Sequence, residues 1–185
     1  MRKYFFLIGF VIGNIAYHVP DFLGNSFFSD RPFHAYVDEH PVRWIPNAVL
    51  CLEIQQKKSF VNQEKVFRKS LNQFSSLTGI SYSRNCLNHN VLIAIDTREH
   101  LNYLKTNRAI GASTYKFDPA VPLDILGGRI ELDLNFLRDA SEKSIELLIL
   151  HELGHVIGLA HTRDGGIMEA DIDDAHSLRF NSESV

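Results

Sequence analysis

Residues 151–161 read HELGHVIGLAH and hold three of the nine histidines of the chain. His151 and His155 are four residues apart. On an α-helix their imidazoles therefore lie on one face, with Cα atoms about 6 Å apart along the axis. Two imidazoles so placed can bind one zinc ion. Glu152 projects about 100° further round the helix, where it can reach a water on the ion rather than the ion itself. The spacing predicts a zinc site with a general base beside it.

Gly158 predicts where this helix ends. Glycine takes the left-handed conformation that terminates helices, and the resulting turn brings His161 back as a third nitrogen ligand. Three neutral ligands leave a fourth position for water, which is typical of a catalytic zinc site. The alternative is an ordinary helix end whose histidines bind no metal. The fixed spacing of five residues, at the end of a helix that is hydrophobic on nearly all sides, disfavours that alternative.

The stretch matches H-E-x-x-H-x-x-G-x-x-H, and the chain resembles the metzincin zinc peptidases, which carry this motif. The resemblance implies an α+β, zincin-like catalytic domain. It would have a twisted mixed β-sheet, a long first helix, a central zinc-binding helix, a Met-turn and a short C-terminal helix. Met168, in GGIM seven residues past His161, is the methionine that the resemblance assigns to the Met-turn. The alternative for Met168 is an ordinary core methionine.

Among the metzincins the chain resembles the matrixins over about residues 43–175, beginning with RW-x-P at Arg43. GGRIELD (127–133) resembles a GGDxHFD-like matrixin segment. AIGASTYKF (109–117) resembles the strand at the upper rim of the matrixin cleft, so the resemblance implies that an extended substrate pairs with it. A plain internal strand is the alternative. The residues expected to pair with substrate are Gly111, Ala112, Ser113 and Thr114.

The chain also departs from the matrixin pattern. Matrixins commonly hold a second, structural zinc through histidines in those two upstream segments, but the matching places here hold Ser113 and Glu131. We therefore expect one catalytic zinc and no structural zinc. The acidic cluster of Asp171, Asp173 and Asp174 lacks the spacing of an EF-hand. We interpret that cluster as a solvated cap of a short helix over 173–180 rather than as a calcium site.

Hydrophobic periodicity predicts the remaining elements of a single α+β domain without internal repeats. A helix is expected over 60–79, with Gly79 as its C-cap. A buried helix that runs into the zinc motif is expected to begin with a capping box of Asp139 and Glu142. The expected strands are 48–54, 80–83, 90–96, 109–117 and 127–136.

The N-terminus predicts export. Arg2 and Lys3 precede a short apolar run, too short to span a bilayer comfortably, so residues 1–16 are interpreted as a signal peptide. A buried element or an uncleaved membrane anchor is the alternative. We expect residues 17–43 to form an irregular arm or short pro-segment and residues 44–185 the catalytic domain. The mature protein would be periplasmic or extracellular, without stable membrane association.

Net charge bears on the binding partners of the protein, and the two cysteines bear on a possible disulfide. A net charge of −3 and the absence of a long basic run disfavour nucleic acid. Cys51 and Cys86 could form a disulfide in an exported protein or remain two buried free thiols. The sequence favours neither alternative.

The sequence as a whole predicts a secreted zinc endopeptidase, with Glu152 as general base and a protein or peptide as substrate. The alternative is a catalytically silent zinc-containing module on the same fold that binds a peptide or protein. An intact Glu152 argues against it, because a silent site has no chemical use for a base.

Overall fold

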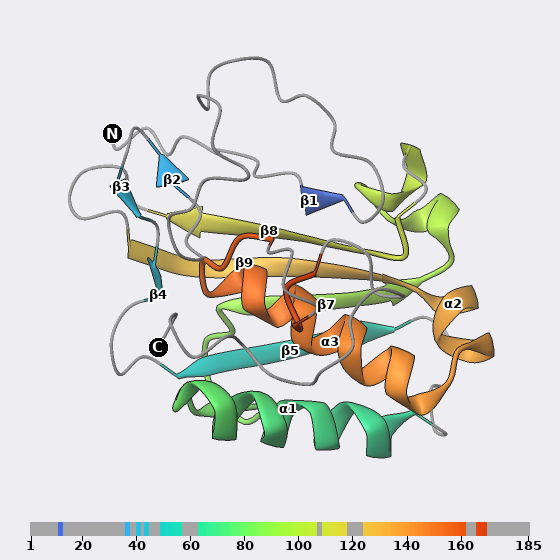
Figure 1. Cartoon of the computed structure of the whole chain (residues 1–185), viewed down its shortest axis with the longest axis horizontal. Helices are drawn as coiled ribbons and strands as arrows, with labels where there is room; N and C mark the ends of the chain where they lie inside the picture. Colours follow the sequence, from blue (N-terminus) through green and yellow to red (C-terminus); the bar gives the residue numbers. More distant parts are fainter. Residues whose placement is uncertain are drawn as a thin grey trace.

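A mixed β-sheet lies at the centre of the fold (Figure 1). In this computed structural model the described residues are 11–12, 36–37, 40–41, 43–44, 49–56, 63–106, 109–117, 124–161 and 166–169. Three parallel strands form the middle of the sheet, and a fourth strand runs antiparallel to β9 at one side. These are β5 (Leu50–Gln56), β7 (Val91–Asp96), β9 (Asp124–Asp133) and the antiparallel β8 (Gly111–Phe117).

Short strands extend or flank this sheet. β6 (Tyr82–Ser83) adds to β5 in parallel, and β4 (Arg43–Trp44) pairs in parallel with the start of β9. β1 (Val11–Ile12) lies antiparallel along β8 and forms the edge of the sheet on that side. β2 (Tyr36–Val37) and β3 (His40–Pro41) make a separate antiparallel pair. The predicted strands over 48–54, 80–83, 90–96 and 109–117 are confirmed, with ends that differ by up to two residues.

Two 15-residue helices complete the main core. α1 (Glu64–Thr78) ends at Gly79, whose φ of 73° is left-handed and whose N–H donates to Ser75, as the sequence predicted. α3 (Glu142–Val156) carries the first two histidines of the motif. The helices pack against each other, and α3 also contacts β8 and β9 (Figure 1). Their buried side chains share one hydrophobic core with the parallel strands.

The start of α3 differs from the prediction. Ser141 is the N-cap, and its hydroxyl accepts the Ser144 N–H at 3.1 Å, so the expected capping box of Asp139 and Glu142 is wrong. Asp139 instead closes the preceding helix and pairs with Arg138 at 2.9 Å. Asp139 and Ser141 both have side chains that can cap helices. Ser141 directly precedes the first residue of α3, and from that position a side chain reaches the N–H groups of the first helical turn.

The predicted strand 127–136 is also too long. β9 stops at Asp133, and Leu134–Asp139 form the short helix α2. The Asp133 side chain accepts the Asn135 N–H at 3.0 Å and caps this helix. Leu137 is then fully buried, which the alternating apolar pattern of 130–136 did not reveal.

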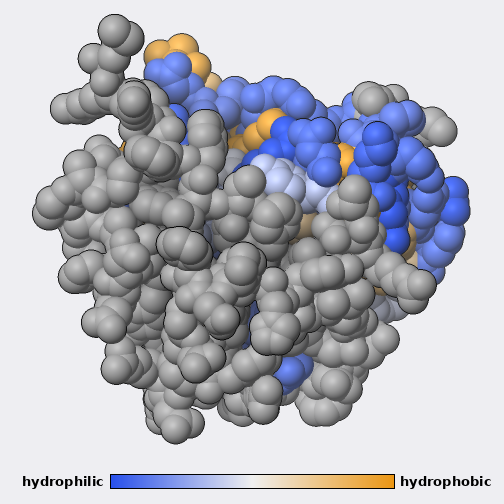
Figure 2. All heavy atoms as spheres, turned by 90° about the horizontal axis from the view of Figure 1, so that it is seen from above, coloured by the Kyte–Doolittle hydropathy of each residue, from blue (hydrophilic) through white to orange (hydrophobic). Residues whose placement is uncertain are grey.

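A smaller apolar cluster packs around Ala112 of β8, together with Ala94, Leu101, Leu104 and Ala109. Leu101 and Leu104 of this cluster come from the segment that forms the 3₁₀ helices η1 (Arg98–His100) and η2 (Leu104–Thr106). The coloured part of the surface seen from above is predominantly hydrophilic (Figure 2). Among the described residues the large hydrophobic side chains that remain exposed are Val49, Leu87 and Leu126.

Cys51 and Cys86 form a disulfide, with Cα atoms 5.8 Å apart, which decides between the two alternatives left open by the sequence. The bond ties β5 to the loop after β6. Apart from β1 to β4, the predicted signal peptide and arm lie outside the described residues, as does the predicted helix 173–180. Within the described part of the chain, no helix has the length and apolar character needed to cross a membrane.

Candidate metal centre and active site

The three histidines of the motif converge. α3 places His151 and His155 one turn apart, and their Nε2 atoms are 3.0 Å apart. The Nε2 atom of His161, beyond the helix end, lies 3.2 Å from that of His151. One nitrogen from each ring falls within 4.8 Å of the other two. The sequence prediction that these residues meet is therefore confirmed.

Backbone carbonyls fix the orientation of two of the rings. The Nδ1 atom of His151 is 2.8 Å from the carbonyl oxygen of Ile167, and that of His155 is 2.8 Å from the carbonyl oxygen of Leu159. A carbonyl only accepts, so each Nδ1 carries the proton and donates it. Each Nε2 is then unprotonated and presents a lone pair to the centre of the cluster, as a metal ligand must.

Burial keeps these rings neutral. Desolvation lowers the pKa of His151 to about 4 and, with the repulsion of His151, lowers that of His161 to about 3. Desolvation also lowers the pKa of His155 well below its usual value. Neutral nitrogens that face one another across about 3 Å without a hydrogen between them repel unless a cation lies among them. The donor set therefore fits zinc, which imidazole nitrogens bind readily.

Gly158 makes the turn that brings the third histidine back. Its φ is 98°, in the left-handed region, and its N–H donates to the His155 carbonyl at 2.9 Å. The helix ends at Val156, and five residues later His161 reaches the other two rings. The predicted role of Gly158 as the helix-ending residue agrees with this geometry.

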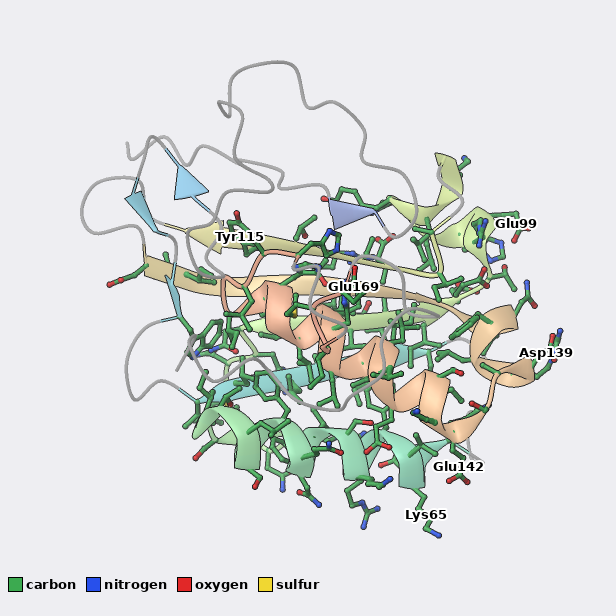
Figure 3. The ribbon with its side chains drawn as sticks, viewed as in Figure 1. Lys65, Glu99, Tyr115, Asp139, Glu142 and Glu169 are labelled. Carbon is green, nitrogen blue, oxygen red and sulfur yellow. A yellow bond between two sulfur atoms is a disulfide. The ribbon has the colours of Figure 1, made fainter. Side chains whose placement is uncertain are left out.

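Met168 belongs to the main hydrophobic core. It is 3% exposed, and its neighbour Ile167 supplies the carbonyl that holds His151. A turn closes here, because the N–H of Glu169 donates to the Gly166 carbonyl at 3.1 Å. Figure 3 shows the labelled Asp139 and Glu142 projecting outward at the periphery.

Glu152 is buried against β8. The Ser113 hydroxyl hydrogen-bonds its Oε2 atom and also lies 3.0 Å from its backbone carbonyl oxygen. Burial raises the pKa of Glu152 to about 8, and the hydrogen bond from Ser113 opposes that rise. A buried carboxyl group with a raised pKa, next to a cluster of metal-ligand type, is a candidate general base.

Ser113 and Glu131, the two positions that match the matrixin histidines, do not face each other. Glu131 on β9 is paired with Ala112 of β8, while the side chain of Ser113 faces α3. The buried Glu131 carboxylate is occupied by hydrogen bonds. Arg129 Nε donates to it at 2.9 Å, and further donors are the backbone N–H groups of Asn102, Tyr103 and Leu104. Ser113 and Glu131 thus point to opposite faces of the sheet, and each makes other hydrogen bonds.

The sequence did not predict the contacts of β8 with Glu152. Gly111 and Ser113 are alternate residues, so both face α3, and a Cβ atom at Gly111 would lie 2.5 Å from Glu152 Oε1. The run of small side chains at 111–113 was the available signal, but only the strand register shows which ones face the helix. Thr114, the last predicted substrate-edge residue, is half-buried on the same strand.

A helix with two histidines and a glutamate, followed by a left-handed glycine and a third histidine, is the arrangement of the zinc-dependent metzincin peptidases. The family model described as Matrixin matches residues 43–183, which is most of the chain. The protein therefore belongs to the matrixin family. Membership implies a zinc metallopeptidase, a hydrolase whose substrates are proteins or peptides.

Proposed function

We propose that this protein is a secreted zinc endopeptidase. One observation carries the proposal: the Nε2 atoms of three buried or half-buried histidines converge beside a buried glutamate. His151, His155 and His161 would hold the ion, and Met168 would form the turn beneath it. Zinc at this position supplies a Lewis acid that polarises a carbonyl and makes a water molecule acidic near neutral pH.

The protein's own residues supply the proton transfer. Glu152 would take a proton from the attacking water as the new C–O bond forms at the peptide carbonyl. It would then give that proton to the leaving nitrogen as the C–N bond breaks. The dipositive ion favours the ionised carboxylate that this role requires and so opposes the effect of burial on the pKa of Glu152.

We further propose that substrate lies antiparallel along the outer edge of β8, at Gly111–Thr114. The pairing of β1 supports this, because Val11 and Ile12 lie opposite Ser113 and Ala112 on that edge. The edge thus accepts an extended strand. Residues 11–12 and a substrate would use the same backbone groups, so a chain from which residues 1–16 have been removed should cleave faster than the full chain.

The experiment compares wild type with Glu152→Gln at equal zinc content, on a mixture of unfolded proteins and N-blocked peptides. Glu146→Gln is the matched control, because Glu146 is also buried on α3 but lies six residues, about 9 Å, earlier along the axis. We expect cleavage by wild type and the control, none by Glu152→Gln, and loss of all cleavage after chelation. Zinc binding without cleavage by wild type would favour the silent binding module instead.

Export rests on the proposed signal peptide at 1–16 and is tested separately. We expect the intact mass of protein recovered outside the cytoplasm to lack this segment. Recovery of a chain that retains residues 1–16 from the periplasm or medium would contradict cleavage, and absence from both would contradict export.

A further inference from the structure

We propose that Ser113 is a positioning residue for the general base: its hydroxyl fixes one oxygen of the Glu152 carboxylate and leaves the other free to exchange protons. This inference rests on the proposed peptidase function and concerns the same site. Ser113 lies on β8, 39 residues before Glu152, so the contact joins the sheet to the active-site helix.

The contact is built into the interior. The exposed fraction is 3% for both Ser113 and Glu152, so water competes poorly for either group. The hydroxyl reaches both the Oε2 atom and the backbone carbonyl oxygen of Glu152, and it can donate its single proton to one of them at a time. A hydrogen bond to a charged carboxylate is stronger than one to a neutral carbonyl, so ionisation of Glu152 favours donation to Oε2.

Gly111 forms the second wall of the same recess. It sits two residues before Ser113 on the same face of β8, and the place where its Cβ would be lies 2.5 Å from Glu152 Oε1 and 2.7 Å from a Leu148 methyl group. The carboxylate therefore occupies space that any other residue at 111 would fill. Ser113 and Gly111 together confine both oxygens of the carboxylate.

This confinement assigns different tasks to the two oxygens. Oε2 accepts from Ser113, so Oε1 is the oxygen that can take the proton from water and return it to the leaving nitrogen. A glutamate side chain without such a partner samples several rotamers, and a displacement of about 1 Å at a reacting group can lower the rate by about 100-fold. The Ser113 hydroxyl would thus act on kcat through Glu152, without touching substrate or metal itself, whereas only the backbone of Ser113 lies on the proposed substrate edge.

The test uses three substitutions at one position. Ser113→Ala removes the hydroxyl, and Ser113→Thr keeps it at the cost of an added methyl group. Ser113→Val has the shape of threonine without the hydroxyl. We expect kcat to fall by about 10- to 100-fold in the alanine and valine variants, with KM and zinc content unchanged. The threonine variant should retain several-fold more activity than valine. Equal activity of threonine and valine, or wild-type kcat in alanine, would overturn the proposal.

A second measurement does not depend on activity. In the metal-free protein, the changes in Tm caused by Ser113→Ala and by Glu152→Ala should not add in the double variant, because both remove the same contact. We expect a discrepancy of about 2 °C or more. Strict additivity would refute the contact. An inactive wild type with a non-additive cycle would count against the proposed function, and with it the positioning role, while it would confirm the contact between Ser113 and Glu152.

Discussion

Replacing Gly111 with alanine tests whether Glu152, the proposed general base, is held against β8. The new Cβ atom would lie 2.5 Å from Glu152 Oε1, about 0.9 Å short of the 3.4 Å at which ordinary van der Waals contact begins. The Leu148 methyl group on the other side, at 2.7 Å, blocks an easy shift of the strand. Part of the strain should therefore move the carboxylate by most of an ångström.

A displacement of that size at a reacting group lowers a rate by about 100-fold, while overpacking a buried site destabilises a protein by about 1–3 kcal/mol. Gly79→Ala is the matched control. Its φ of +73° makes alanine strained, by about 1–2 kcal/mol, but nothing lies within 4 Å of the added atom. The assay is kcat at equal zinc content, with the free energy of unfolding measured on the same samples.

We expect both variants to lose similar stability and only Gly111→Ala to lose kcat. Wild-type kcat in Gly111→Ala would show that this strand does not confine the carboxylate. Equal losses of kcat in the two glycine variants would attribute the defect to destabilisation in general rather than to displacement of Glu152.

Three further predictions concern stability. Reducing the Cys51–Cys86 disulfide, which joins residues 35 apart, should lower the free energy of unfolding by about 4 kcal/mol in urea titrations, and an unchanged midpoint would contradict this. In metal-free Glu152→Gln, where the opposing carboxyl titration is absent, stability should fall between pH 6.5 and 4. The folded state keeps His151 neutral because its pKa is about 4, whereas the unfolded chain takes up a proton on this ring below about pH 6.5. This ring alone therefore accounts for a loss of about 3 kcal/mol in the free energy of unfolding. A stability that does not change over this pH range would exclude a buried neutral ring. Glu131→Gln should lower the free energy of unfolding by about 1–3 kcal/mol and speed amide exchange at 102–104, because the side-chain N–H groups of the new glutamine cannot accept hydrogen bonds from the backbone N–H groups there. Unchanged exchange would contradict that role of Glu131.

The histidine cluster was predictable because local rules fix it. Helical periodicity alone puts His151 and His155 on one face, and a glycine at 158 ends the helix in the left-handed conformation observed. The end of α1 at Gly79 followed from the same rule. Each of these features depends on residues fewer than about ten apart in the sequence, so no tertiary information was needed.

The errors occurred where tertiary register or a competing cap decides. The sequence does not show which face of β8 carries Ser113, because a shift of one residue in register moves every side chain of a strand to the other face. In the structure Ala112 is paired with Glu131, and Ser113 contacts Glu152. The boundary after β9 was missed because Asp133 caps a helix that the apolar alternation could not distinguish from a continued strand.

β8 links the two proposed halves of the active site. One edge pairs with β9, the opposite edge accepts an antiparallel strand at Ala112 and Ser113, and the side chain of Ser113 faces the general base. A substrate paired along that edge would restrain the backbone of the residue that positions Glu152. Binding energy from substrate residues remote from the cleaved bond would then contribute to the order of the base, and so to kcat as well as to affinity. Because one strand carries both the recess for Glu152 and the proposed substrate edge, this coupling requires no conformational change.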